Sequence, residues 1–238
     1  MSNKAYRFLN DTLNGFLSLI YPNNCIICQN ELSDQDQLIC FFCTSDLHYT
    51  HFEKYKASTM ADELFWGRIK LEHVYALLFY EKGNSTQQIL FKIKYQEGQQ
   101  LGVYMGGQLA NRLRSKDWLK DVDAILPIPL HSKKEFKRGY NQSLILAKGF
   151  AEENSIPIKK ALFRKKHHAS QTRKSREERE QNVKGIFGVD GNELKGLNHV
   201  IIIDDVLTTG STLEEAARAI KQFNEKISIS LITLAIAK

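Results

Sequence analysis

Two adjacent carboxylates and a hydroxyl-rich loop follow one another in the segment VIIIDDVLTTGST, residues 200–212. Asp204 and Asp205 come after an apolar run typical of a buried strand. The loop beyond them consists of polar residues around one glycine: Thr208, Thr209, Gly210, Ser211 and Thr212. Because an amphipathic helix is expected directly afterwards, its free N–H groups and its dipole would attract an anion here. The segment therefore predicts a phosphate site next to two acids.

A ligand that carries both a phosphate and hydroxyl groups would satisfy this arrangement. The 5-phosphate of a ribose would bind the loop, and its 2- and 3-hydroxyls would donate to Asp204 and Asp205. Ser211 and Glu214 have the spacing of a capping box. A strand that simply ends in a helix cap is the alternative, although it needs only one acid. An ATPase is excluded because no G-x-x-x-x-G-K-[ST] motif occurs. A phospho-receiver domain fits poorly, because its acids come early in the chain.

Four cysteines form a second constellation near the N-terminus, in NNCIICQNELSDQDQLICFFC. Two Cys-x2-Cys pairs supply the four thiolates of a closed, structural zinc site. The ligands would be Cys25, Cys28, Cys40 and Cys43. Two disulfides are the alternative, which a reducing compartment disfavours. A module this small has little core, so bound Zn²⁺ would contribute much of its folding free energy.

The positive charge of the chain is concentrated in one region. The net charge is +6, but residues 131–184 alone hold 15 Lys and Arg against 6 Glu and no Asp. Such a region suggests a site for phosphates or nucleic acid, and a solvated surface without a partner is the equally weighted alternative.

Apolar strands that alternate with amphipathic helices predict an α/β fold with a parallel sheet covered by helices. Strands are expected at 74–80, 124–128, 199–203 and 229–237, and helices at 85–95, 102–114, 141–154 and 213–223. Another amphipathic helix is expected between Leu9 and Ile20. We place the cysteine module at 1–60 and the larger domain at 61–238.

The apolar stretches of the chain are too short to span a bilayer. Residues 1–22 contain neither an uninterrupted apolar region nor a small-residue cleavage site, so we expect no signal peptide. These features predict a cytoplasmic protein without a transmembrane segment.

Taken together, these motifs resemble the ComF family, competence-associated proteins like type I phosphoribosyltransferases with an N-terminal zinc ribbon. IIIDDVLTTGST is similar to the loop that binds phosphoribosyl pyrophosphate (PRPP) in those enzymes. The two cysteine pairs, KIKYQEG (92–98), PIPLHSKKEFKRGYNQS (127–143) and HHASQTRKSREEREQNVKGIF (167–187) occur in the family's order. Tyr140 stands where Phe is common and keeps an aromatic ring.

The resemblance implies a role for each matching position. Asp204 and Asp205 would hold the ribose hydroxyls, and residues 208–212 the 5-phosphate. A pyrophosphate loop is implied at His131, Ser132 and Lys133, with Arg138 nearby. A mobile loop is implied at 171–182, with its recurring residues at Gln171, Arg179 and Asn182. Mg²⁺ would accompany PRPP.

Two functions follow from this resemblance. The first is PRPP binding combined with the handling of single-stranded DNA during natural transformation, which implies a DNA-uptake or helicase partner. Phe41 and Phe42 could stack bases there, or at least one of them could pack the core of the cysteine module. The second is a phosphoribosyltransferase of nucleotide metabolism or base salvage, although the sequence offers no convincing acceptor site. Lys94 and Tyr95 fit a helix surface as well as a site.

Overall fold

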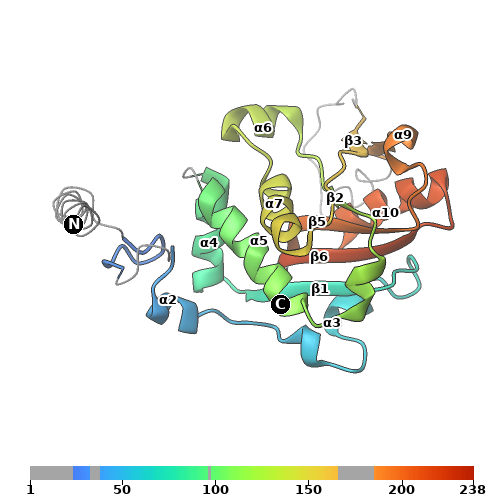
Figure 1. Cartoon of the computed structure of the whole chain (residues 1–238). Coiled ribbons are helices and arrows are strands. Elements are labelled where there is room, and N and C mark those ends of the chain that lie inside the picture. The colour runs from blue at the N-terminus through green and yellow to red at the C-terminus, as the bar shows by residue number, and fades with distance from the viewer. Residues whose placement is uncertain (1–23, 33–37, 96–97, 166–184) are drawn as a thin grey trace, which may run out of the picture. The chain divides into compact units, whose positions relative to one another are not determined.

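The structure is a computed structural model that describes residues 24–32, 38–95, 98–165 and 185–238 (Figure 1). The chain separates into two compact units, Met1–Leu47 and His48–Lys238. The helix expected between Leu9 and Ile20 lies outside the described residues. In the first unit the described helix is α2 (Phe41–Ser45), which begins directly after Cys40.

Residues 48–60, which the sequence places with the cysteine module, are part of the second unit in the structure. Tyr49 forms an antiparallel bridge with Leu78, and the Thr50 hydroxyl donates to the carbonyl of Ala76 at 2.6 Å. This segment is therefore fixed to the first strand of the sheet, which explains why the compact unit begins at His48.

A four-stranded parallel sheet forms the centre of the second unit, with the strand order β1-β6-β5-β2. The strands are β1 (Val74–Tyr80), β2 (Ala124–Pro127), β5 (His199–Leu207) and β6 (Ser228–Ala237). Ile125 of β2 also forms a parallel bridge with Ile158. Residues 200–203 are fully buried, as their uninterrupted apolar run predicts.

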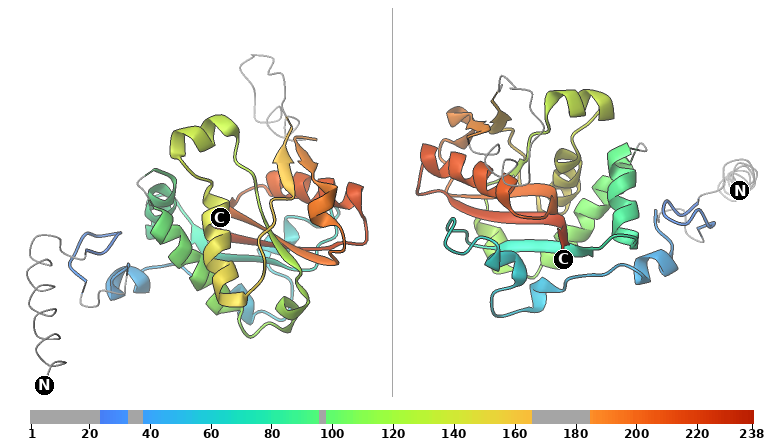
Figure 2. Two further views of the ribbon diagram at one scale, coloured as in Figure 1. Left: turned by 45° about the horizontal axis from the view of Figure 1, so that its top comes forward. Right: turned by 180° about the vertical axis from the view of Figure 1, so that it is seen from behind.

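Helices cover both faces of this sheet (Figures 1 and 2). The helices of one face are α4 (Ser85–Tyr95), α5 (Gln99–Leu113) and α7 (Gln142–Asn154). On the other face lies α10 (Ser211–Phe223), which packs its Leu213, Ala216, Ala217 and Ile220 into the core. The predicted fold class, a type I phosphoribosyltransferase-like α/β fold with a flanked parallel sheet, is confirmed.

Shorter elements complete the second unit. They are α3 (Met60–Glu63), α6 (Ser132–Arg138), α9 (Gly191–Leu194) and the 3-10 helices Phe52–Lys54 and Asp117–Asp121. An antiparallel pair of strands, β3 (Leu162–Arg164) and β4 (Phe187–Val189), forms a separate two-stranded sheet. This pair is not predicted from the sequence, because three-residue strands are too short to show an alternating pattern.

Candidate functional site

Asp204 lies near the carboxyl end of β5, next to the start of α7. Its carboxylate accepts a hydrogen bond from the Ser143 hydroxyl at 2.7 Å and from the backbone N–H of Asp205 at 2.9 Å. Burial and the neighbouring charge of Asp205 raise the pKa of Asp204 to about 7, while the bond from Ser143 opposes that rise. The carboxyl group therefore titrates near neutral pH.

Asp205 forms an ion pair with a lysine from a different helix. Its Oδ2 lies 2.8 Å from Nζ of Lys94, and the side chains are 18% and 26% exposed. Lys94 is near the end of α4. The structure thus brings Lys94 into contact with the acid pair, a contact that the helix periodicity alone did not reveal.

Gly210 gives the hydroxyl-rich loop its turn into α10. Its φ is +78°, a left-handed conformation that glycine adopts without strain, and it is the N-cap residue of α10. Thr208 and Thr209 are exposed, and the hydroxyls of Thr209 and Ser211 lie 3.0 Å apart. Thr212 follows in the first turn of the helix. Gly210 has no side chain to cap α10, and the Ser211 N–H makes only a long bond of 3.5 Å to the Thr209 hydroxyl. The N–H groups of this first turn are therefore placed to bind an anion.

The predicted capping box of Ser211 and Glu214 is wrong. The helix begins one residue earlier than that motif requires, because Gly210 and not Ser211 is the N-cap residue. The carboxylate of Glu214 is bound instead by the guanidinium groups of Arg68 and Arg218.

The segment of the implied pyrophosphate loop is a short exposed helix. His131 is the N-cap residue of α6, and its Nδ1 accepts from the Lys133 N–H at 3.2 Å. Ser132 and Lys133 are exposed, and the Arg138 guanidinium lies 5.2 Å from the ring centre of Tyr95. The contact joins α6 to the end of α4, the helix that also provides Lys94. The assignment of pyrophosphate to these residues stays a prediction.

Gln171, Arg179 and Asn182 lie outside the described residues. The described chain on either side of them forms β3 and β4. Arg164 in β3 donates from Nε to the Pro129 carbonyl at 2.9 Å. Burial lowers the pKa of Arg164, and the charge of Asp204 opposes that shift. The positive charge of Arg164 therefore acts on Asp204 from β3, and no motif in the sequence indicates it.

The four cysteines of the first unit converge on one point. One Sγ atom from each of Cys25, Cys28, Cys40 and Cys43 lies within 4.8 Å of all the others, and those of Cys28 and Cys40 are 3.7 Å apart. Four sulfurs around Zn²⁺ at about 2.3 Å would be about 3.8 Å from one another. Burial opposes ionisation of Cys25, yet N–H groups of Cys40, Cys28 and Ile27 lower its pKa to about 6. The group could hold a metal ion.

None of the helices in the described part of the chain is both long and apolar enough to cross a bilayer.

Residues 100–238 match the family model described as phosphoribosyl transferase domain, so the chain belongs to that family. Competence protein F of Haemophilus influenzae is 36% identical over 115 residues, which are 47% of this chain and 50% of the relative. Competence protein ComFC of Bacillus subtilis is 34% identical over 110 residues, 46% of this chain and 43% of the relative. The relatives support a ComF-family protein, and the resemblance stated from the sequence is confirmed.

A third relative is the DNA utilization protein YhgH of Salmonella typhimurium, 34% identical over 106 residues, 44% of this chain and 46% of the relative. The chain spans about half the length of the curated relatives it matches. Among solved structures, the glutamine PRPP amidotransferase from B. subtilis has a TM-score of 0.39 at 17% identity, covering 60% of this chain and 30% of that one. Orotate phosphoribosyltransferase from Aeropyrum pernix has a TM-score of 0.35 at 13% identity, with 67% and 68% covered.

Proposed function

We propose that the second unit binds PRPP together with Mg²⁺. Asp204 and Asp205 would accept hydrogen bonds from the ribose hydroxyls, and residues 208–212 would bind the 5-phosphate. His131, Ser132, Lys133 and Arg138 would contact the pyrophosphate. The observation that carries the proposal is the N-terminus of α10, whose N-cap residue Gly210 has no capping side chain and lies five residues beyond a carboxylate pair at the same end of β5.

The electrostatics of the site favour a ligand with separated phosphate and hydroxyl groups. Two carboxylates would repel a phosphate that they contacted directly, whereas they bind hydroxyl donors well. The helix N-terminus attracts a phosphate through its free N–H groups and its dipole. Lys94 pairs with Asp205, and the charge of Arg164 acts on Asp204, so both cations offset the mutual repulsion of the acids.

Isothermal titration with PRPP and Mg²⁺ tests this function. We expect the wild-type protein to bind and the variant Asp204→Asn/Asp205→Asn to lose about 100-fold or more in affinity, since each charge-assisted hydrogen bond contributes about 1.5–3 kcal/mol. Lys120→Ala/Asp117→Asn removes an exposed ion pair elsewhere and serves as the control. Equal affinities of the wild type and the double aspartate variant would refute the proposed site.

As a second part of the function, the protein would handle single-stranded DNA during natural transformation. Phe41 and Phe42 are 77% and 79% exposed, and their rings meet edge to face at 6.1 Å. The alternative that one of them packs the core of the cysteine unit is therefore not supported. Exposed aromatic rings are suited to stacking bases. A DNA-uptake or helicase protein would be a further partner in this role.

Binding of an oligothymidine at increasing salt concentrations tests the DNA proposal. We expect Phe41→Ala/Phe42→Ala to weaken binding at every salt concentration, because stacking contributes about 1–3 kcal/mol per base. Affinity itself should fall steeply with salt, since neutralised phosphates release counterions. The absence of binding even at low ionic strength would remove DNA from the proposal.

An active phosphoribosyltransferase of nucleotide metabolism or base salvage is the alternative. The measurement that distinguishes the two functions is pyrophosphate release from PRPP in the presence of a panel of bases and amines, with the Asp204→Asn/Asp205→Asn variant as the negative control.

The proposal also includes Zn²⁺ as the structural ion of the cysteines. It includes a cytoplasmic location as well, because four thiols kept free for a metal suit a reducing compartment.

A further inference from the structure

We propose that Arg68 is a positioning residue of the loop 208–212: it holds this loop in the shape that leaves the α10 N-terminus open to a phosphate. The inference rests on the proposed PRPP function and assigns no contact between Arg68 and the ligand. Arg68 lies outside residues 100–238, the part of the chain that matches the family model, so the match assigns it no role.

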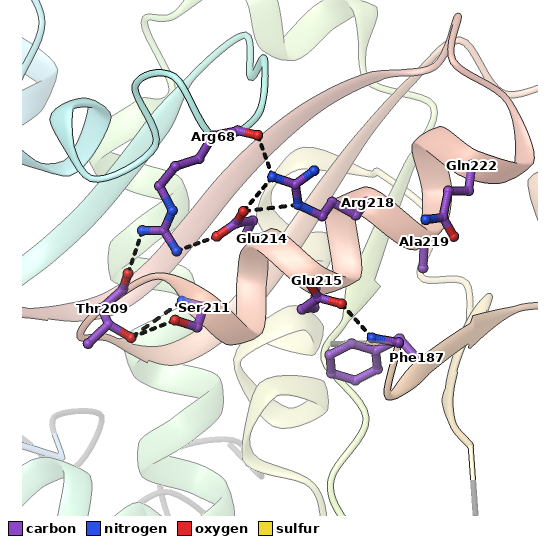
Figure 3. A pocket seen from close by; sticks show the side chains of 10 residues that line it. Arg68, Phe187, Thr209, Ser211, Glu214, Glu215, Arg218, Ala219 and Gln222 are labelled. Carbon is purple, nitrogen blue, oxygen red and sulfur yellow. Dashed lines mark hydrogen bonds and ion pairs between the residues drawn. The ribbon is translucent and has the colours of Figure 1, made fainter. Parts of the chain in front are cut away.

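The guanidinium group of Arg68 connects the loop to the chain segment before β1. Its Nη1 donates to the Leu64 carbonyl at 2.8 Å and to the Thr209 carbonyl at 2.9 Å, and its Nη2 binds the Glu214 carboxylate (Figure 3). Thr209 thus presents its carbonyl to Arg68, while its hydroxyl lies beside that of Ser211. A carbonyl oxygen bound in this way cannot turn toward an incoming phosphate.

Arg218 makes a second set of contacts that fixes Arg68 itself. Its Nη2 donates to the Arg68 carbonyl at 2.6 Å, and its Nε donates to the Glu214 carboxylate at 2.9 Å. Burial raises the pKa of Glu214, but the two arginines outweigh this effect and lower it, so the carboxylate is charged. Glu214 therefore joins both guanidinium groups to the first turn of α10.

Packing under the loop supports the same role. A Cβ atom at Gly210 would lie 2.9 Å from the Phe65 ring, closer than non-bonded carbon atoms approach. The segment Phe65–Arg68 thus fits directly against the turn. The Arg68 contacts border a cavity of about 660 Å³, which Figure 3 shows along α10 and beside Phe187. The Arg68 side chain is 34% exposed, so solvent reaches it.

The physical effect of Arg68 is on the population of the binding-competent loop. When a ligand binds only one of several loop conformations, its apparent affinity is its intrinsic affinity multiplied by the fraction of molecules in that conformation. Without Arg68 the Thr209 carbonyl and Glu214 lose their common partner, and the loop samples other conformations. We expect Arg68→Ala to weaken the binding of ribose 5-phosphate and PRPP about tenfold.

The experiment compares three ligands by isothermal titration: ribose 5-phosphate, PRPP with Mg²⁺, and inorganic pyrophosphate with Mg²⁺. Arg68→Ala should weaken the first two and leave pyrophosphate affinity unchanged, a difference that a general loss of structure would not produce. Arg68→Lys, which can retain one contact but not all three, should fall between wild type and alanine. Arg114→Ala removes an arginine that pairs with Glu153 and is the matched control.

The outcomes separate this inference from the proposed function. If the wild type binds neither ribose 5-phosphate nor PRPP, the proposed function fails and the role of Arg68 fails with it. Wild-type binding combined with unchanged affinity in Arg68→Ala refutes the positioning role alone. An equal loss for all three ligands also refutes it, because it indicates a direct or non-specific effect of the charge. Should Arg68→Ala not fold, Arg68→Lys and Glu214→Gln provide the same comparison.

Discussion

Asp204 is the side chain of the candidate site whose charged form costs the most stability, because it is buried next to a second acid. Its carboxyl group is placed among groups that favour different protonation states: burial and Asp205 raise its pKa, whereas Ser143 and Lys94 lower it. The resulting pKa of about 7 exceeds the value of 3.8 for an unperturbed Asp. The folded protein therefore holds this proton more tightly than the unfolded chain.

The pH dependence of stability tests this arrangement. Since the folded pKa is raised, the contribution of Asp204 is most favourable below about pH 4 and is lost as the pH rises through 7. Asp204→Asn should thus be more stable than the wild type at pH 8, by about 2–4 kcal/mol, and the difference should shrink at pH 5. Urea unfolding at both pH values measures it. A pH-independent gain in Asp204→Asn would contradict the assigned pKa.

The sequence predicts which residues can do chemistry, but not most of their partners. Asp204, Asp205 and the cysteines are found from residue type and spacing alone. Ser143, Lys94, Arg164 and Arg68 are not, because their contacts join segments that only the fold brings together. The i, i+3 spacing of Ser211 and Glu214 is a local pattern, but Glu214 pairs instead with Arg218 one turn later in α10 and with the distant Arg68.

At the scale of elements, the crossing of α5 and α7 fixes the start of α7 and therefore Ser143. Gly106 and Gly149 allow the two backbones to approach closely, since a Cβ at Gly149 would collide with the carbonyl of Val103. Gly149→Ala should destabilise the protein by about 2–3 kcal/mol, because backbone atoms cannot rotate away as a side chain can. Thermal unfolding measures the effect.

Gly107→Ala is the matched control for this crossing. In the same helix α5, a Cβ at Gly107 would meet only Glu153 Cγ, at 3.9 Å. Alanine there should stabilise the helix by about 0.5–1 kcal/mol. A loss in Gly107→Ala equal to that in Gly149→Ala would contradict this assignment, because alanine at Gly107 meets no backbone atom of α7.

The alternation of apolar strands and amphipathic helices predicts most elements because each buries a continuous face. The strand at 74–80 and the helix at 85–95 agree with the structure residue by residue. β5 continues to Leu207, four residues beyond its apolar run, because pairing with β6 extends past the acids as far as Leu207 and Ile236. Pairing depends on the neighbouring strand, which a local pattern does not contain.

At the scale of the whole molecule, the two compact units depend on different sources of stability. The second unit buries the strands of its parallel sheet and one face of each flanking helix, whereas the described part of the first contains few buried apolar side chains: Cys25, Leu32, Ile39 and Leu47. These four side chains of the described residues alone cannot offset the conformational entropy of an ordered chain. We therefore expect the first unit to depend on its metal ion for folding.

Removal of the metal should affect the two units unequally. After treatment with a strong chelator, we expect hydrogen exchange protection to be lost at residues 24–32 and 38–47 and retained in the strands of the second unit. PRPP affinity should stay unchanged, because residues 204–212 belong to the second unit. Binding of an oligothymidine should weaken, because Phe41 and Phe42 lose their ordered positions when the first unit unfolds.

Cys28→Ser should reproduce this pattern without chelator. Ser45→Ala, a change at an exposed residue that is not a metal ligand, should not reproduce it. Retained protection at residues 38–47 in protein that metal analysis shows to be free of zinc would mean that the thiols and the small apolar core suffice to fold the unit.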